Sequence, residues 1–128
     1  MEIYSSPVVR IEFDTTKKLL LQKWIGFASS VQFREAIDKT VEFVKGNQVK
    51  YLMSNTVEQK PVGPEESKYA ASVMPQLFGG GVKAMAFVMP KNVITKLALS
   101  SFAKEKGMPD NVQYFDNLAE AETWLLKH

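Results

Sequence analysis

Near its beginning the chain has two stretches whose hydrophobic pattern is typical of β-strands. From Val8 to Asp14 apolar and charged residues alternate, which predicts a strand with one face in solvent. From Lys18 to Ile25 apolar residues occur on both sides of the run, which predicts a more central strand. The polar segment 14–17 between them predicts a turn, so we expect the two strands to form a hairpin.

A helix is predicted after this hairpin, from Val31 to Lys45. Ser29 and Gln32 have the spacing of a capping box, and Gly46 is expected to end the helix in a left-handed conformation. The apolar positions at helical spacing are Phe33, Ala36, Ile37, Thr40, Val41 and Val44.

A short strand, a polar loop and a second helix are predicted in the middle of the chain. The strand spans Val49 to Met53 and the loop spans Asn55 to Gly63. Pro64 suits the first position of the helix, and Pro75 is expected to kink or end that helix because proline lacks the donor N–H. The glycines 79–81 end the helical pattern.

The last part of the chain repeats a strand-then-helix order twice. The first unit is a strand from Lys83 to Met89 and a helix from about Lys91 to Lys106. The second is a strand from Val112 to Phe115 and a final helix that Asn117 is expected to cap. Four residues of the final helix are expected to face the core: Leu118, Ala121, Trp124 and Leu125.

These elements predict a single α/β domain, residues 1–128, with the order β-β-α-β-α-β-α-β-α. Right-handed crossovers would make the sheet five-stranded and mostly parallel, with an antiparallel N-terminal strand. In the strand before Pro90, alternation places Met85, Phe87 and Met89 on one side and the alanines 84 and 86 on the other. Small residues suit a closely packed helix, so we expect the Met/Phe side to be the looser face.

Composition narrows the classes of function. The chain is 45% hydrophobic and 23% charged, which is ordinary for a globular domain. The net charge is +2 with no concentrated basic cluster, so nucleic acid is not an expected partner. There is no cysteine, no apolar stretch long enough to span a membrane and no recognisable signal peptide. We therefore expect a cytoplasmic protein without disulfides or thiolate metal sites.

Residues for catalysis or metal binding are scarce. The only histidine is His128, the last residue, which we expect to be frayed. Carboxylates such as Glu65 and Glu120 occur where helix starts and solvated faces favour them. The glycines 79–81 follow a helix and precede a strand, which is the reverse of the order in a phosphate-binding loop. We expect no enzyme activity, cofactor or metal.

Methionine and aromatic residues suggest a possible binding face. They either fill the core or line an adaptable apolar surface for a ligand or partner. At the carboxyl end of one strand, Lys91 and Asn92 stand at a predicted helix start, where backbone N–H groups hold anions well. The candidate face comprises Trp24, Met53, Met85, Phe87, Met89, Lys91 and Asn92.

Several motifs resemble those of a known group of proteins. They are Trp24-Ile25-Gly26, the Pro-Glu-Glu opening at Pro64, the internal Met74-Pro75, the strand ending at Pro90, and Phe115 to Leu125. Together they resemble bacterial STAS-like proteins, related in fold to anti-sigma-factor antagonists and to the lipid-carrying half of CRAL-TRIO proteins. The resemblance implies a STAS-like fold and says little about activity.

The resemblance implies two kinds of function. Antagonists accept phosphate at a Ser or Thr near a helix start, and Ser54, Thr56 or Ser67 would stand in for that residue, although none has the family's neighbouring residues. The CRAL-TRIO branch holds a lipid in an apolar slot. We expect a non-enzymatic regulatory or protein-interaction module, or alternatively a binder of a small apolar or lipid-like ligand. The expected partner is a protein, a second copy of this chain included, or an apolar small molecule.

Overall fold

A computed structural model describes residues 1–60, 64–90 and 111–128. In this part of the chain six strands form one sheet whose spatial order follows the chain order. The strands are β1 (Glu2–Ser5), β2 (Val9–Asp14), β3 (Leu19–Gly26), β4 (Tyr51–Gln59), β5 (Ala84–Val88) and β6 (Val112–Phe115). The pairs β1–β2 and β2–β3 are antiparallel, and β3 to β6 are parallel to one another. The predicted class, a mostly parallel α/β sheet with an antiparallel N-terminal part, is confirmed.

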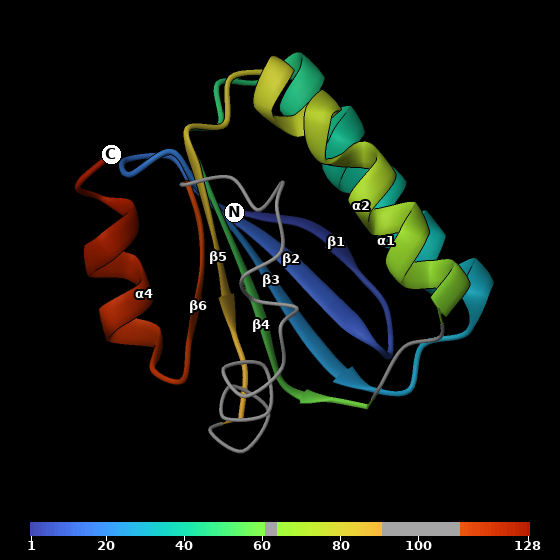
Figure 1. Cartoon of the computed structure of the whole chain (residues 1–128). Helices are drawn as coiled ribbons and strands as arrows, with labels where there is room; N and C mark the ends of the chain where they lie inside the picture. Colours follow the sequence, from blue (N-terminus) through green and yellow to red (C-terminus); the bar gives the residue numbers. More distant parts are fainter. Residues whose placement is uncertain (61–63, 91–110) are drawn as a thin grey trace.

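The described helices lie on opposite faces of this sheet (Figure 1). Helices α1 (Ser30–Gly46) and α2 (Pro64–Gly79) lie side by side on one face, and α4 (Leu118–Leu125) lies on the other. We call these the α1/α2 face and the α4 face. Because α4 packs against β4, β5 and β6, the α4 face of β2 and the end of β3 has no helix over it among the described residues.

Alternation along the strands produces two separate apolar cores. The larger core, on the α1/α2 face, joins β2 residues such as Ile11 to Trp24, Leu52 and Met85. The smaller core, on the α4 face, joins Met53, the alanines 84 and 86, and Leu125. The small side chains at positions 84 and 86 let α4 approach β5 closely, as the sequence indicated for that side.

A buried polar network fixes the centre of the α1/α2 face. Gln22 donates from Nε2 to Thr40 Oγ1 at 2.7 Å, and its Oε1 accepts from Trp24 Nε1 at 3.3 Å. Thr40 in turn donates to the Ala36 carbonyl at 3.0 Å. Buried polar groups destabilise a core unless they are hydrogen-bonded, and this chain of bonds therefore pairs β3 with α1 in one orientation.

Several sequence-based boundaries are wrong. The sheet has six strands because Glu2–Ser5 adds an edge strand, and β4 extends to Gln59, through residues that we predicted as loop. Gly46 is the last residue of α1, whereas the left-handed glycines of the described residues are Gly26 and Gly81. Helix α2 does not end at Pro75 but continues to Gly79, where the predicted glycines end it; its apolar contacts with α1 and the sheet compensate for the hydrogen bond lost at Pro75.

The final helix also differs from its prediction in one position. Asn117 caps it as expected, with Oδ1 accepting from the Glu120 amide at 3.0 Å. Ala121 and Leu125 are buried, but Leu118 is 48% exposed because it precedes the stretch of α4 that touches the sheet core. The helix predicted for Lys91–Lys106 lies outside the described residues.

Candidate interaction surface

The structure places the three candidate phosphosites in different surroundings. Ser54 lies on β4 and is only 4% exposed, so a kinase would not reach its hydroxyl in the folded chain. Thr56 is half-buried and donates from Oγ1 to the Val88 carbonyl at 2.8 Å, which ties β4 to β5. Ser67 lies in α2, and its side chain is outside what the structure describes. Neither Ser54 nor Thr56 therefore stands out as a phosphoacceptor.

The predicted Met/aromatic face is divided between the two sides of the sheet. Trp24, Met85 and Phe87 belong to the α1/α2 core, whereas Met53 belongs to the α4 core. Met89 is half-buried and follows β5, and Lys91 and Asn92 lie outside the described residues. The face is therefore not one surface, because Met53 and Met85 lie on opposite sides of paired strands.

The α1/α2 side of the sheet is filled by its own helices rather than left loose. The one described cavity beneath α2 that Met85 and Phe87 line has a volume of about 50 Å³. Sites for small organic ligands usually measure about 300 Å³ or more, so this space is too small for a lipid-like ligand. Ser54, Gln22 and Thr40 also line it, and its volume suits a water molecule better.

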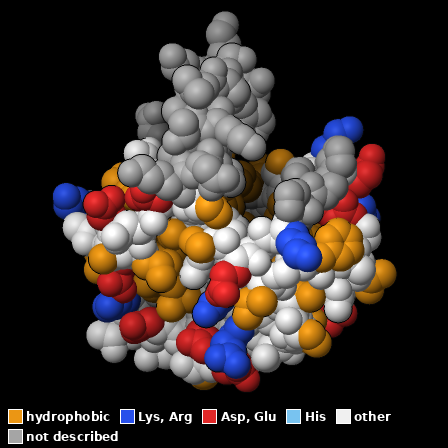
Figure 2. All heavy atoms as spheres, turned by 90° about the horizontal axis from the view of Figure 1, so that it is seen from below, with side chains coloured by type: hydrophobic (Ala, Val, Ile, Leu, Met, Phe, Trp, Pro, Cys, Tyr) orange, Lys and Arg blue, Asp and Glu red, His pale blue; other side chains and the backbone are white. Residues whose placement is uncertain are grey.

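Exposed hydrophobic side chains are concentrated instead where β3 and β4 end. Seven large hydrophobic side chains of the described residues are exposed, and four of them belong to this end of the sheet. These four are Ile25 at 43%, Phe27 at 64%, Val31 at 73% and Val57 at 44% exposure. We call them the strand-end patch. Figure 2 views the molecule from this end and shows hydrophobic side chains between acidic and basic ones.

The backbone brings the parts of the strand-end patch to one edge. Ile25 pairs with Glu58 and Gly26 with Gln59 in the parallel β3–β4 ladder, and the Lys60 amide donates to the Gly26 carbonyl at 3.0 Å. Gly26 has φ +68°, a left-handed conformation that turns the chain away from the sheet toward α1. Phe27 therefore lies at the turn itself, outside both regular elements.

The start of α1 is held rigidly beside this turn. Ser29 and Gln32 form the predicted capping box, with bonds of 3.2 Å and 3.0 Å. Ser30 Oγ donates to the Glu66 carboxylate of α2, a bond that lowers the pKa of that carboxyl from its usual value. These bonds fix the position of Val31, which points away from the apolar stripe of α1 that packs on the sheet.

Ionic groups border the strand-end patch. Lys23 Nζ lies 3.6 Å from Glu58 Oε2, and Arg34 of α1 lies over the Tyr69 ring at 5.0 Å. Tyr69 donates to Asp38, which raises the pKa of the tyrosine because its hydrogen bond to the carboxylate favours the protonated phenol. Among the described residues no cluster of His, Cys, Asp and Glu has the arrangement of a metal site.

The C-terminal histidine is held in place, contrary to the expected fraying. The ring of His128 lies against Trp124, with centroids 4.4 Å apart, and its Nδ1 is 3.0 Å from the Trp124 carbonyl oxygen. Tyr51 donates from its hydroxyl to the His128 carbonyl at 3.2 Å. The aromatic contact and the bond to β4 order the end of the chain.

Sequence reasoning missed the strand-end patch, although a signal was present. Val31 falls outside the apolar stripe predicted for α1, and Phe27 stands between the glycine that ends the second predicted strand and the capping serine. Apolar residues that serve neither a helix stripe nor a strand face are candidates for an interaction surface. The sequence alone did not show that β4 continues far enough to bring Val57 to the same edge.

The comparisons with known proteins bear on the fold. No protein-family model matches the chain, and no curated protein matches it. Its structure is similar to that of an uncharacterised DUF3478-family protein with a SpoIIAA-like fold from Shewanella loihica PV-4, with a TM-score of 0.60. The match covers 95% of this chain and 98% of the other, at 13% identity. The chain therefore has the STAS-like, SpoIIAA-like fold that its motifs indicated.

Proposed function

We propose that this protein is a non-enzymatic interaction module that binds a partner protein through the strand-end patch. The observation that carries the proposal is the concentration of Ile25, Phe27, Val31 and Val57 at one edge, each at least 43% exposed. Exposing large apolar side chains to water is unfavourable, and monomeric proteins usually scatter them singly. A patch that combines an aromatic residue with aliphatic ones and has a charged border is typical of a protein interface.

The scaffold supports such a role because the patch is fixed in advance. The capping box at Ser29 and the Ser30–Glu66 bond hold the start of α1, and the β3–β4 ladder holds Ile25. The backbone of this surface is already ordered before a partner binds, which reduces the entropic cost of binding. Phe27 is the expected anchor, since a few aromatic residues commonly carry most of the binding energy.

The test begins by finding the partner through a photoreactive amino acid at position 27 in the native cells. The matched control carries it at Gln113, an exposed position on the edge strand β6, outside the strand-end patch. A protein that crosslinks only at position 27 is then purified, and its affinity for the wild-type chain is measured. A discrete adduct with a second copy of the chain would identify a homodimer instead.

Binding must depend on the patch for the proposal to hold. Phe27→Asp and Val31→Asp should each weaken the affinity by about tenfold or more, with circular dichroism spectra unchanged because both side chains are exposed. Leu126→Asp, at a 44% exposed position directly after α4 and outside the strand-end patch, should leave the affinity unchanged. Equal affinities for all three variants, or the same adducts at positions 27 and 113, would contradict the proposal.

A further inference from the structure

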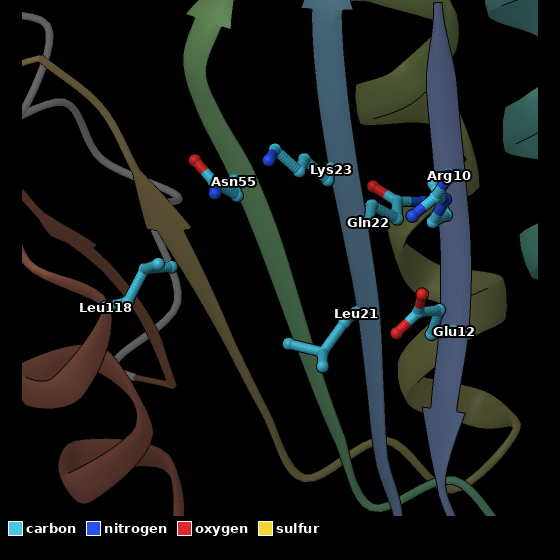
Figure 3. A pocket seen from close by; sticks show the side chains of 7 residues that line it. All are labelled: Arg10, Glu12, Leu21, Gln22, Lys23, Asn55 and Leu118. Carbon is cyan, nitrogen blue, oxygen red and sulfur yellow. The ribbon is translucent and has the colours of Figure 1, made fainter. Parts of the chain in front are cut away.

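A groove opens on the α4 face where none of the described helices lies over β2 and β3. It has a volume of about 220 Å³ and is lined by Arg10, Glu12, Leu21, Lys23, Asn55 and Leu118, together with Gln22. We call it the open-face groove. Figure 3 shows its side chains arriving from β2, β3, β4 and the start of α4. It lies on the opposite side of the sheet from the Met85 and Phe87 side chains, where the sequence placed a possible ligand.

Strand register arranges the groove as two rows of side chains. Arg10 pairs with Lys23, and Lys23 pairs with Asn55, so two cations and an amide form the first row. Glu12 pairs with Leu21, and Leu21 pairs with Met53, so the second row becomes apolar toward α4. The two rows are adjacent, because neighbouring positions on one face of a strand are two residues apart.

The first row is unfavourable for the protein alone. Like charges directly opposite each other on antiparallel strands are destabilising, and Arg10 and Lys23 are such a pair. Each cation has one long ion pair: Glu2 Oε1 lies 3.5 Å from Arg10 Nε, and Glu58 Oε2 lies 3.6 Å from Lys23 Nζ. Charge-assisted hydrogen bonds between such groups measure about 2.7–2.9 Å, so both cations retain capacity for a further anion.

The amide of Asn55 is oriented to assist an anion. Its Oδ1 accepts a bond from the Val57 amide at 3.2 Å, which leaves Nδ2 to act as the donor on the groove side. Figure 3 shows the Lys23 ammonium extending from β3 toward Asn55. A carboxylate or phosphate over the first row would accept bonds from Arg10, Lys23 and Asn55 together.

The second row supplies an apolar floor beside this anion position. Leu21 and Leu118 extend toward each other from β3 and α4 (Figure 3), and Leu118 is 48% exposed. A second hollow of about 200 Å³ adjoins the groove through these two leucines and is also lined by Met53, Ala119 and Glu122. Glu122 is paired with Lys17 at 2.7 Å, and Glu12 stands at the outer corner of the floor.

We propose that the open-face groove binds a small amphiphilic anion, with its charged head over Arg10, Lys23 and Asn55 and its apolar chain along Leu21 and Leu118. Burial of the chain would cover the exposed Leu118, and the head would relieve the repulsion between Arg10 and Lys23. The negative charge of Glu12 keeps the head away from the second row and so fixes the orientation. This site adjoins the strand-end patch at Lys23 but includes none of its four exposed hydrophobic residues.

The test is a titration of the ¹⁵N-labelled full chain with octanoate, followed by chemical shifts. Saturable shifts are expected at Lys23, Leu118 and the Asn55 side-chain amide. The titration is repeated with octyl phosphate. If octyl phosphate binds more tightly than octanoate, the natural ligand has a phosphate head, and if it binds more weakly, the ligand has a carboxylate head. Octylamine and octanol, which lack the anion, should bind at least about fivefold more weakly.

Variants test the contribution of the two cations in the first row. Arg10→Gln and Lys23→Gln should each weaken octanoate binding about fivefold, while Glu58→Gln should strengthen it about twofold by freeing Lys23. Lys39→Gln, which removes a charge from the exposed side of α1, should have no effect. The proposal is overturned by absence of saturable shifts, by equal binding of octanol, or by equal affinities of Lys23→Gln and Lys39→Gln.

Discussion

The two faces of the sheet are covered to different extents, although the same strands form both. On the α1/α2 face, two long helices lie over Leu20, Trp24 and Leu52, all nearly inaccessible to solvent. On the α4 face, one helix of 8 residues covers β4, β5 and β6 in the part of the chain that the structure describes. Strand β3 shows the consequence: Leu19 is buried on the α4 face, but Lys23 and Ile25 on the same face are exposed.

The two faces of the sheet therefore differ in their roles. The fully covered face contains the buried network of Gln22, Thr40 and Trp24, so it fixes the structure. The half-covered face leaves side chains such as Arg10 and Lys23 accessible for contacts with other molecules. A core covered by two helices tolerates few side-chain substitutions, whereas exposed side chains on an open sheet face can be substituted without unfolding the protein.

The largest expected effect compares the two cores directly. Leu20→Ala removes a fully buried side chain from the α1/α2 face, and Leu125→Ala removes one from the α4 face. Each should lower the free energy of unfolding by about 3 kcal/mol. The two tryptophans report on different faces, so urea unfolding is followed by Trp24 fluorescence in a Trp124→Phe background and by Trp124 fluorescence in a Trp24→Phe background.

The faces should respond differently to these two substitutions. Leu20→Ala should shift the Trp24 and Trp124 transitions together, because the large core supports the whole sheet. Leu125→Ala should shift the Trp124 transition to lower urea than the Trp24 transition, since α4 is short and detaches first. Leu126→Ala, at an exposed neighbouring position, is the control. Coincident transitions in Leu125→Ala would show that the two faces unfold as one unit.

A smaller effect is expected from the buried network on the α1/α2 face. Thr40→Val removes the acceptor of the Gln22 amide and leaves that donor buried without its partner, which should cost about 2 kcal/mol. Thr123→Val is the matched control, because Thr123 on α4 makes the same bond to a carbonyl four residues earlier but is exposed. Similar stabilities of the two variants in urea would show that the network does not stabilise the core.

The covered face was largely predictable from the sequence. Strand β2 shows a period of two and α1 a period near four, and both signals arise from burial of one side against a core. The Ser29 capping box was also predictable, because it depends on residues three apart in the chain. Local patterns encode local structure well where one face is buried.

The open face and the strand-end patch were not predictable in this way. Strand β1 is a short edge strand without a clear period, and the polar end of β4 resembles a loop in sequence. The open-face groove joins Arg10, Lys23, Asn55 and Leu118, which only the register of three strands and the placement of α4 bring together. Register depends on long-range pairing, and the turn at Lys18, with φ 58°, gives little signal of it.

The smallest expected effect tests how α4 is attached at the edge of the open face. Lys17 in the β2–β3 turn donates to Glu122 at 2.7 Å, and this bond raises the pKa of Lys17. A raised pKa in the folded state means that the pair contributes its full stability below the unfolded-state pKa of lysine and loses it as the pH rises through the folded value. Both side chains are substantially exposed, so the contribution is small and sensitive to salt.

Hydrogen exchange of the α4 amides measures this attachment directly. Lys17→Gln should increase local opening at Ala121 and Leu125 about twofold at low salt, with global stability almost unchanged. High salt should remove the difference between the variant and the wild type, because screening weakens the pair. Lys39→Gln, on the other face of the sheet, should not change exchange in α4. If Lys17→Gln also leaves exchange unchanged at low salt, α4 is held by its apolar contacts with the sheet and the Tyr51–His128 bond without help from the ion pair, and the open face begins where those apolar contacts end.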